Sequence, residues 1–121
     1  MKEKILILDD DNDILEILTI ILSESGYEIK TLNCGDRIFE ELIQFKPKLL
    51  LLDIMIGDMN GLSICREIKE NALTSSLPVI LISASHDLDK SLNLQGAPDG
   101  FLAKPFDIDI LLNKIEKYVK V

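Results

Sequence analysis

Carboxylates at the ends of two apolar segments are the residues of this chain best suited to chemistry. Asp9 and Asp10 directly follow the segment Lys4–Leu8, and Asp53 directly follows the run Leu49–Leu52. Short continuous apolar runs bounded by turn residues predict strands buried on both faces of a sheet. The acids would then lie at the rim of the sheet, where open α/β sheets bind ligands. Asp53 is therefore the candidate reactive residue.

A hydroxyl and a lysine follow two later apolar segments in the same way. Ser83 comes after 79–82, and Lys104 comes after 100–103. Crowded carboxylates raise one another's pKa unless a cation lies among them, and hard oxygen ligands favour Mg²⁺, which also binds phosphate. A lysine and a hydroxyl would hold other phosphate oxygens, and Asp53 would be a nucleophile that becomes an aspartyl phosphate. These residues predict a Mg²⁺-assisted phosphoryl acceptor.

Five predicted strands alternate with five predicted helices. The strands are expected at Lys4–Leu8, Tyr27–Leu32, Leu49–Leu52, Val79–Ile82 and Gly100–Ala103. The helices are expected over about 13–25, from 36 to the Lys46-Pro47 break, from 62 onward, over 86–95, and after a cap at Asp107. Such alternation predicts an α/β fold, a doubly wound parallel sheet with right-handed crossovers. A flavodoxin-like (βα)5 strand order of 2-1-3-4-5 would place the alternating segment Tyr27–Leu32 at an edge.

The apolar positions of the helices predict which faces meet the sheet. In the first helix, helical spacing selects Ile14, Ile17, Leu18 and Ile21, while further apolar residues widen the stripe. That width indicates either a broad core contact or a docking surface. In the third helix Cys65 and Ile68 should point inward and Lys69 outward. The last helix has an expected inner face of Ile108, Leu111, Leu112, Ile115 and Val119.

Length, charge and cysteine content narrow the function classes. The 121 residues predict one domain over 1–121, and the net charge of −8 argues against binding of nucleic acid or of an anionic membrane surface by this segment. Cys34 and Cys65 have no metal-ligand spacing and are expected to be reduced, in a cytoplasmic protein. The first apolar segment is too short for a membrane span or a signal peptide.

Four motifs, in this order, resemble the receiver domain of bacterial two-component response regulators: ILILDDDND, LLLLDIMIGDMNG, VILISAS and GFLAKPF. The resemblance covers essentially the whole chain. It implies a signalling domain whose only catalysis is its own phosphorylation and dephosphorylation. The implied partner is a sensor histidine kinase or a histidine phosphotransfer domain.

The resemblance also implies roles for individual residues. Asp9 and Asp10 match the acidic pair that anchors Mg²⁺, for which Mn²⁺ is a substitute, and Asp53 matches the phosphoacceptor. The backbone carbonyl of Met55 matches a further metal ligand. Lys104 matches the phosphate-binding lysine.

A conformational switch is implied at two more positions. Ser83 matches the hydroxyl that turns toward the phosphoryl group, and Phe101 matches the aromatic residue that follows this movement. Phosphorylation would bias a surface formed by the 86–95 helix, the 100–103 strand and the last helix. Dimerisation through these two helices is an open alternative.

Three departures from the family pattern carry expectations. Gly57 stands where the family usually has proline, which predicts a more mobile loop. The 83–104 segment is about one residue short, with an unusual Pro98. Met55 and Ser85 provide neither an acid nor an amide that could align an attacking water. We therefore expect a long-lived phosphoryl group, and decay within seconds in magnesium would contradict this.

The acidic cluster also has interpretations other than a phosphoacceptor site. The segment 9–13 alone could be a solvated helix cap, and as an EF-hand it fails because Ile14 and Ile20 replace the required Gly and Glu. A haloacid-dehalogenase phosphatase would use Asp9 and Asp11, but its metal-binding acids follow the lysine, whereas Asp53 precedes it. A receiver-like scaffold that binds partners without phosphorylation is the third alternative.

Overall fold

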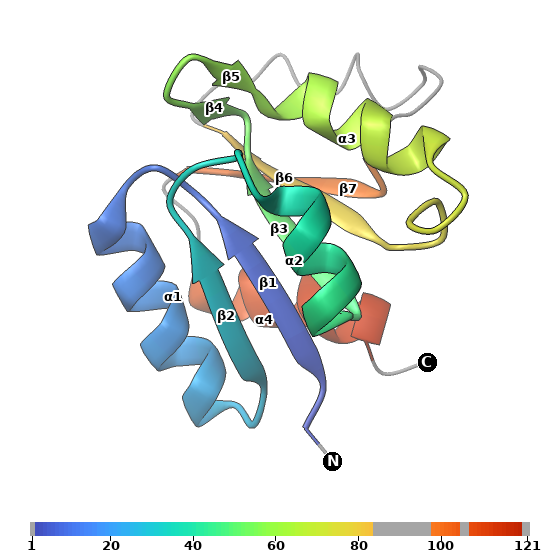
Figure 1. Ribbon diagram of the computed structural model, residues 1–121. Helices are drawn as coiled ribbons and strands as arrows, with labels where there is room; N and C mark the ends of the chain where they lie inside the picture. Colours follow the sequence, from blue (N-terminus) through green and yellow to red (C-terminus); the bar gives the residue numbers. More distant parts are fainter. Residues whose placement is uncertain (1, 84–97, 105–106, 120–121) are drawn as a thin grey trace.

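Five parallel strands form one sheet in a computed structural model that describes residues 2–83, 98–104 and 107–119 (Figure 1). The strand order is β2-β1-β3-β6-β7, which is the predicted order 2-1-3-4-5 counted along the chain. The strands are β1 (Lys4–Leu8), β2 (Glu28–Leu32), β3 (Leu49–Asp53), β6 (Val79–Ser83) and β7 (Gly100–Ala103). The predicted flavodoxin-like fold is confirmed.

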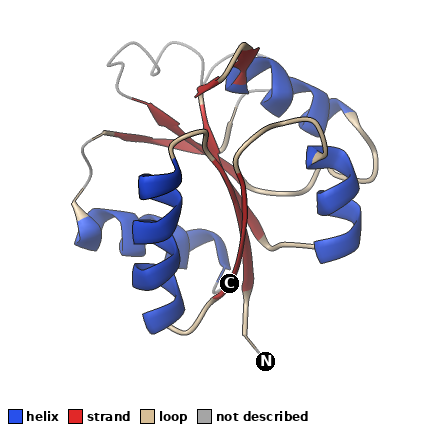
Figure 2. Cartoon of the chain, turned by 60° about the vertical axis from the view of Figure 1, so that its left-hand side comes forward, coloured by secondary structure: helices blue, strands red, loops and turns tan. Residues whose placement is uncertain are grey.

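Helices cover both faces of this sheet (Figure 2). The helices are α1 (Asn12–Glu24), α2 (Ile38–Phe45), α3 (Gly61–Glu70) and α4 (Ile108–Val119). Residues of α1 and α4 share one hydrophobic core with one set of strand residues, and residues of α2 and α3 share a second core with the alternate set. The helix predicted over 86–95, and Ser85, lie outside the described residues. No helix within the described ranges is long and apolar enough to cross a membrane.

The leucine run of β3 shows why the sequence folds in layers. All residues of β3 are buried, with Leu49 and Leu51 in the α1–α4 core and Leu50 and Leu52 in the α2–α3 core. Successive side chains of a strand point to opposite faces, so a continuous apolar run supplies both cores at once. The run ends where the sheet ends, at Asp53.

Two helices begin with side-chain caps, and the cap at Asp107 was predicted. The side chain of Asp11 accepts hydrogen bonds from the backbone N–H groups of Asp13 and Ile14 at the start of α1. Asp107 accepts from Asp109 and Ile110 in the same way. Each cap satisfies amides that the first helical turn leaves without a partner.

Each of two predicted helix faces is wrong at one residue, Ile17 in α1 and Ile108 in α4, while the other predicted residues lie in or against the core. In α1 the buried residues are Leu15, Leu18 and Leu22, while Ile17 is 53% exposed. Seven apolar residues in this helix allow more than one helical stripe, so spacing alone could not select the buried one. Ile108 is 49% exposed because it lies in the first turn of α4, ahead of the residues that meet the sheet.

Two further features differ from the predictions. Lys69 does not point simply outward, because its Nζ donates to the carbonyl oxygen of Leu77 at 2.8 Å. The loop after Asp53 contains an antiparallel hairpin that was not predicted, made of β4 (Met55–Ile56) and β5 (Met59–Asn60). The residues between its strands, Gly57 and Asp58, form the shortest common hairpin connection.

Candidate functional site

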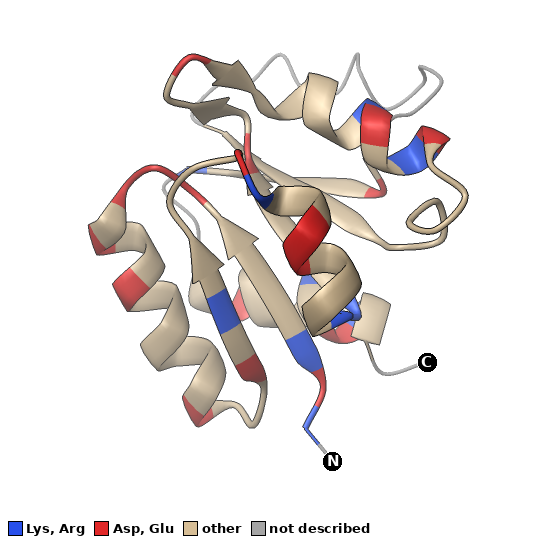
Figure 3. Cartoon of the chain, viewed as in Figure 1, with Lys and Arg blue, Asp and Glu red and all other residues tan. Residues whose placement is uncertain are grey.

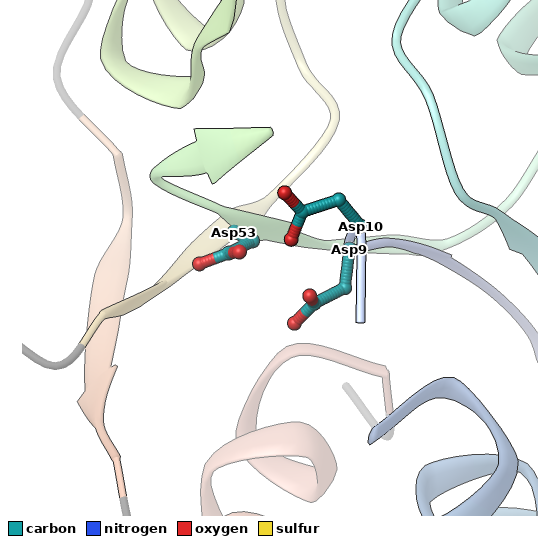
Figure 4. Close-up of side chains that lie close together, drawn as sticks. All are labelled: Asp9, Asp10 and Asp53. Carbon is teal, nitrogen blue, oxygen red and sulfur yellow. The ribbon is translucent and has the colours of Figure 1, made fainter. Parts of the chain in front are cut away.

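Three carboxylates meet at the carboxyl end of β1 and β3 (Figure 4). Asp9 and Asp10 follow β1, Asp53 ends β3, and the two strands are hydrogen-bonded neighbours. One carboxylate oxygen from each residue lies within 4.8 Å of the others. Asp9 and Asp53 are only 1% and 5% exposed, whereas Asp10 is exposed. The predicted convergence of these acids at one rim is therefore present.

Lys104 provides a positive charge to this group from the carboxyl end of the edge strand β7, which is separated from β3 by β6. Its Nζ donates to Oδ2 of Asp9 at 3.1 Å and lies 3.6 Å from Oδ1 of Asp53. Because the lysine follows β7 directly, it lies at the same carboxyl end of the parallel sheet as the acids. One ammonium group thus faces two buried carboxylates.

The ionisation of Asp53 reflects this crowding. Burial raises the pKa of Asp53 to about 6, and the charge of Asp9 adds to the rise. The Lys104 ammonium and a hydrogen bond from the Met55 backbone oppose the rise in pKa but do not cancel it. A further cation would relieve the remaining repulsion. Three clustered carboxylate oxygens, two of them on buried residues, are a donor set that suits a hard divalent cation.

The hairpin contributes a contact that the sequence analysis missed. The backbone N–H of Gly57 donates to Oδ2 of Asp10 at 3.0 Å. Gly57 has a φ of 60°, and proline at this position could neither adopt that φ nor donate the hydrogen bond. A two-residue Gly-Asp step between Ile56 and Met59 was the signal that could have predicted the turn.

Gly61 is a second residue whose role the sequence analysis missed. A Cβ on Gly61 would lie 2.3 Å from the backbone oxygen of Asp53, and its N–H donates to the oxygen of Ile54 at 2.7 Å. Asn60 caps α3 by accepting from Leu62. The pair Asn60-Gly61 therefore packs the start of α3 directly against the end of β3.

The remaining predicted site residues lie at or near the same carboxyl end of the sheet. Ser83 ends β6 and is 2% exposed; the residue before it is opposite Asp53 in the ladder. Met55 begins β4, two residues after Asp53. Phe101 lies in β7 opposite Leu81 and packs against the α2–α3 core. Their assigned roles in phosphate binding, metal binding and switching remain predictions.

This arrangement can support nucleophilic chemistry by a carboxylate. Asp53 has a carboxylate oxygen at the open rim, two neighbouring acids able to share a metal ion, and a lysine able to attract an anionic substrate. Within the described residues, no histidine or cysteine belongs to this group. The donor atoms of this group are therefore carboxylate oxygens and one ammonium nitrogen.

Comparisons with known proteins place this geometry in a family. Residues 5–116 match the response regulator receiver domain. The DNA-binding response regulator MtrA of Mycobacterium tuberculosis is 33% identical over 107 residues, which cover 88% of this chain and 46% of MtrA. The transcriptional regulatory protein GltR of Pseudomonas aeruginosa is 32% identical over 117 residues, covering 96% and 48%. The chain spans about half the length of the curated relatives it matches.

Solved structures agree on the fold. A response regulator from Chloroflexus aurantiacus superimposes with a TM-score of 0.90 over the full length of both chains, at 24% identity. The receiver domain of a signal transduction histidine kinase from Syntrophus aciditrophicus gives 0.87 at 28% identity, covering 98% of this chain and 90% of that one. The chain belongs to the response regulator receiver domains, the signalling domains of two-component systems.

Proposed function

We propose that Asp53 accepts a phosphoryl group from a sensor histidine kinase or a histidine phosphotransfer domain. The observation that carries this proposal is the cluster of Asp9, Asp10 and Asp53, with carboxylate oxygens within 4.8 Å of one another, and the Lys104 ammonium 3.6 Å from Asp53. Residues 1–121 act as a single receiver domain located in the cytoplasm. The domain catalyses only its own phosphorylation and dephosphorylation.

The transfer itself exchanges one bond to phosphorus for another. A carboxylate oxygen of Asp53 attacks the phosphorus of a phosphohistidine, and an O–P bond forms as the P–N bond breaks. The electron pair remains on the imidazole nitrogen, which takes a proton from solvent. Asp53 must be ionised to attack, and a pKa of about 6 leaves most of it ionised at neutral pH.

A divalent metal fits the acidic end of the site. Asp9, Asp10 and Asp53, with the backbone carbonyl of Met55, would hold Mg²⁺, or Mn²⁺ in its place. The bound ion would neutralise charge on the carboxylates and on the phosphoryl oxygens. Lys104 would bind a phosphoryl oxygen as it now binds Asp9, and the Ser83 hydroxyl would donate to another.

Phosphorylation would then be transmitted to a surface. Ser83 and Phe101 lie on the neighbouring strands β6 and β7, so a movement of the Ser83 side chain toward the phosphoryl group would change the space available to Phe101. The surface affected comprises residues 86–95, β7 and α4, and any homodimer would form there. The domain itself makes no direct nucleic-acid contact; in relatives such as MtrA, described as DNA-binding, this chain matches less than half of the protein.

Intact-mass measurement with a small phosphodonor tests this proposal. The wild-type protein and Asp53→Asn are incubated with acetyl phosphate and Mg²⁺, with and without EDTA. A gain of one phosphoryl group in the wild type alone, abolished by EDTA, is the expected result. No gain in a folded wild-type protein would contradict it and favour a binding scaffold, and turnover of a generic phosphate ester would favour a phosphatase.

A further inference from the structure

A second concave region lies at the opposite end of the sheet from the acidic site. It is a cleft of about 390 Å³ formed by four parts of the chain: Leu42 in α2, Lys46–Lys48 before β3, the 73–78 segment before β6, and Tyr118 near the end of α4. Asp53 lies at the other end of β3, and a five-residue strand is roughly 15 Å long. A ligand in this cleft would leave the phosphorylation site accessible.

Lysines are concentrated around this cleft, although the chain carries a net charge of −8. A neighbouring hollow of about 260 Å³ shares Lys46 and Lys48 with the cleft and adds Lys2, Glu3 and Lys4. Glu3 is the one acid among these residues, and it is paired with Lys48 at 3.3 Å. Within the described ranges, Lys2 and Lys46 form no ion pair. The surface therefore keeps excess positive charge for an external anion. We name these two adjoining hollows the basic cleft.

Apolar side chains form part of the lining of the basic cleft, next to the polar side chains of Thr74, Ser76 and Tyr118. Leu42, Pro47, Leu77 and Pro78 line it, and Leu73 is 78% exposed, the most exposed large apolar side chain in the described part of the chain. An exposed leucine beside a cleft is a feature of interaction sites more than of ordinary solvated surface. The combination of exposed apolar side chains and a lysine border suits a ligand with both apolar and negatively charged groups.

The wall is held in place by hydrogen bonds, so the cleft is formed before any ligand binds. Lys69 Nζ donates to the Leu77 oxygen at 2.8 Å and to Oδ2 of Asp99 at 2.6 Å. The same Asp99 oxygen accepts from the backbone N–H of Val79, and its backbone oxygen accepts from the Tyr118 hydroxyl. A preformed wall reduces the entropy lost on binding.

Two simpler explanations account for only part of this surface. Lys46 caps the carboxyl end of α2, where a positive charge offsets the helix dipole, but this does not explain Leu73 or the other lysines. A nucleotide would need donors and acceptors for its base. The Thr74 and Tyr118 hydroxyls in the cleft already donate to the backbone oxygens of Ile68 and Asp99, and the lining contains no Asn, Gln, Asp or Arg side chain.

We propose that the basic cleft binds an acidic segment of a partner protein. An apolar side chain of that segment would pack beside Leu73, and its carboxylates would pair with Lys46, Lys48 and the lysines near the amino end of β1. Binding would not require phosphorylation, because the cleft and Asp53 lie at opposite ends of the sheet. This inference does not depend on the function proposed for Asp53.

Fluorescence anisotropy with a labelled synthetic peptide of glutamates around one central leucine tests the proposal. The full chain should bind this peptide, and added salt should weaken binding. Lys46→Glu/Lys48→Glu should weaken binding about tenfold or more, and Leu73→Ser should weaken it about threefold, in line with lost charge pairing and apolar burial. Arg66→Glu, a charge reversal at an exposed position of α3 outside the cleft, is the matched control and should leave affinity unchanged.

Each outcome decides the proposal. Circular dichroism confirms that the variants are folded, and Asp53→Asn and EDTA should not alter peptide binding. Absence of binding by the wild type, or equal losses for Arg66→Glu and Lys46→Glu/Lys48→Glu, would overturn the proposal. Binding of ATP but not of the peptide would overturn it in favour of a nucleotide site.

Discussion

The folded protein disfavours the ionised form of the Asp53 side chain. Its pKa is raised to about 6 mainly by burial and then by the nearby charge of Asp9, and Lys104 compensates only in part. Such strain is useful at a site that is to accept a metal ion and a phosphoryl group, because each new ligand relieves it. The same strain has a measurable effect on stability.

Asp53→Asn should stabilise the metal-free protein near neutral pH. The folded state binds the Asp53 proton more tightly than the unfolded state does, so this residue lowers the free energy of unfolding as pH rises from about 4 to 6. Near pH 7 in EDTA, the variant should be more stable by about 1–3 kcal/mol, and near pH 4 the difference should vanish. Urea unfolding at both pH values measures this. A variant that is less stable than the wild type near pH 7 would contradict the charge argument.

Lys104→Met should separate metal binding from phosphoryl transfer. The ammonium of Lys104 binds Oδ2 of Asp9, an oxygen that a metal ion would also use, so the lysine competes with the metal. Removing a partly buried ion pair worth on the order of 1 kcal/mol should tighten Mg²⁺ binding about fivefold. Phosphorylation by acetyl phosphate should become slower, because a phosphoryl-binding group is lost. Calorimetric titration with Mg²⁺ and intact-mass time courses measure the two effects; weaker Mg²⁺ binding would show that the lysine supports the metal.

At the scale of elements, the β4–β5 hairpin connects the acidic cluster to the start of α3. Gly57 donates to Asp10 from one end of the hairpin, and Gly61 lies against Asp53 at the other. The hairpin therefore fixes the Asp10 side chain and packs against the backbone of Asp53. Its geometry depends on glycine at both positions, for different reasons: a positive φ at Gly57 and a close backbone contact at Gly61.

Substitutions of Gly57 should distinguish its backbone conformation from its hydrogen bond. Gly57→Ala keeps the N–H group but places a Cβ at φ 60°, and should cost about 1 kcal/mol of stability with little change in Mg²⁺ affinity. Gly57→Pro loses the donor to Asp10 as well, and should lower stability further and change Mg²⁺ affinity. Gly26→Ala is the matched control, with a φ of 96°, no atom within 4 Å of the added Cβ and no contact with the site. Equal Mg²⁺ affinity in Gly57→Pro and Gly26→Ala would mean that the hairpin contact does not influence the metal site.

Helices and strands could be predicted from the sequence where a local pattern of apolar residues determines them. Buried strands such as β3 are apolar on both faces, so the sequence predicted their positions and hence the rim at which Asp9 and Asp53 meet. The buried face of α1 was predicted only in part: Leu18 was correct, but the many apolar residues fit several stripes, and only packing selects Leu15 and Leu22 and leaves Ile17 exposed. Lys69 was misplaced because its partner, Asp99, is thirty residues away in the sequence.

Across the whole molecule, acidic residues lie at both ends of the sheet (Figure 3), but the cluster of three carboxylates lies where the strands end, and Lys2, Lys4, Lys46 and Lys48 lie near where the strands begin. A net charge of −8 predicts neither location, because it averages over both ends.

The order of motifs did identify the family, since each motif follows one strand and the fold brings the strand ends together. The basic cleft was not predicted, since its lysines are far apart in the sequence and only the fold assembles them.

Localising the phosphoryl group shows which carboxylate accepts it. After incubation with acetyl phosphate and Mg²⁺, borohydride reduces an aspartyl phosphate to homoserine, which tandem mass spectrometry assigns to one residue. We expect modification confined to Asp53 and absent when EDTA is present. Modification at Asp9 or Asp10 with Asp53 unchanged would contradict it, because those residues would then be nucleophiles and not the residues that hold the metal.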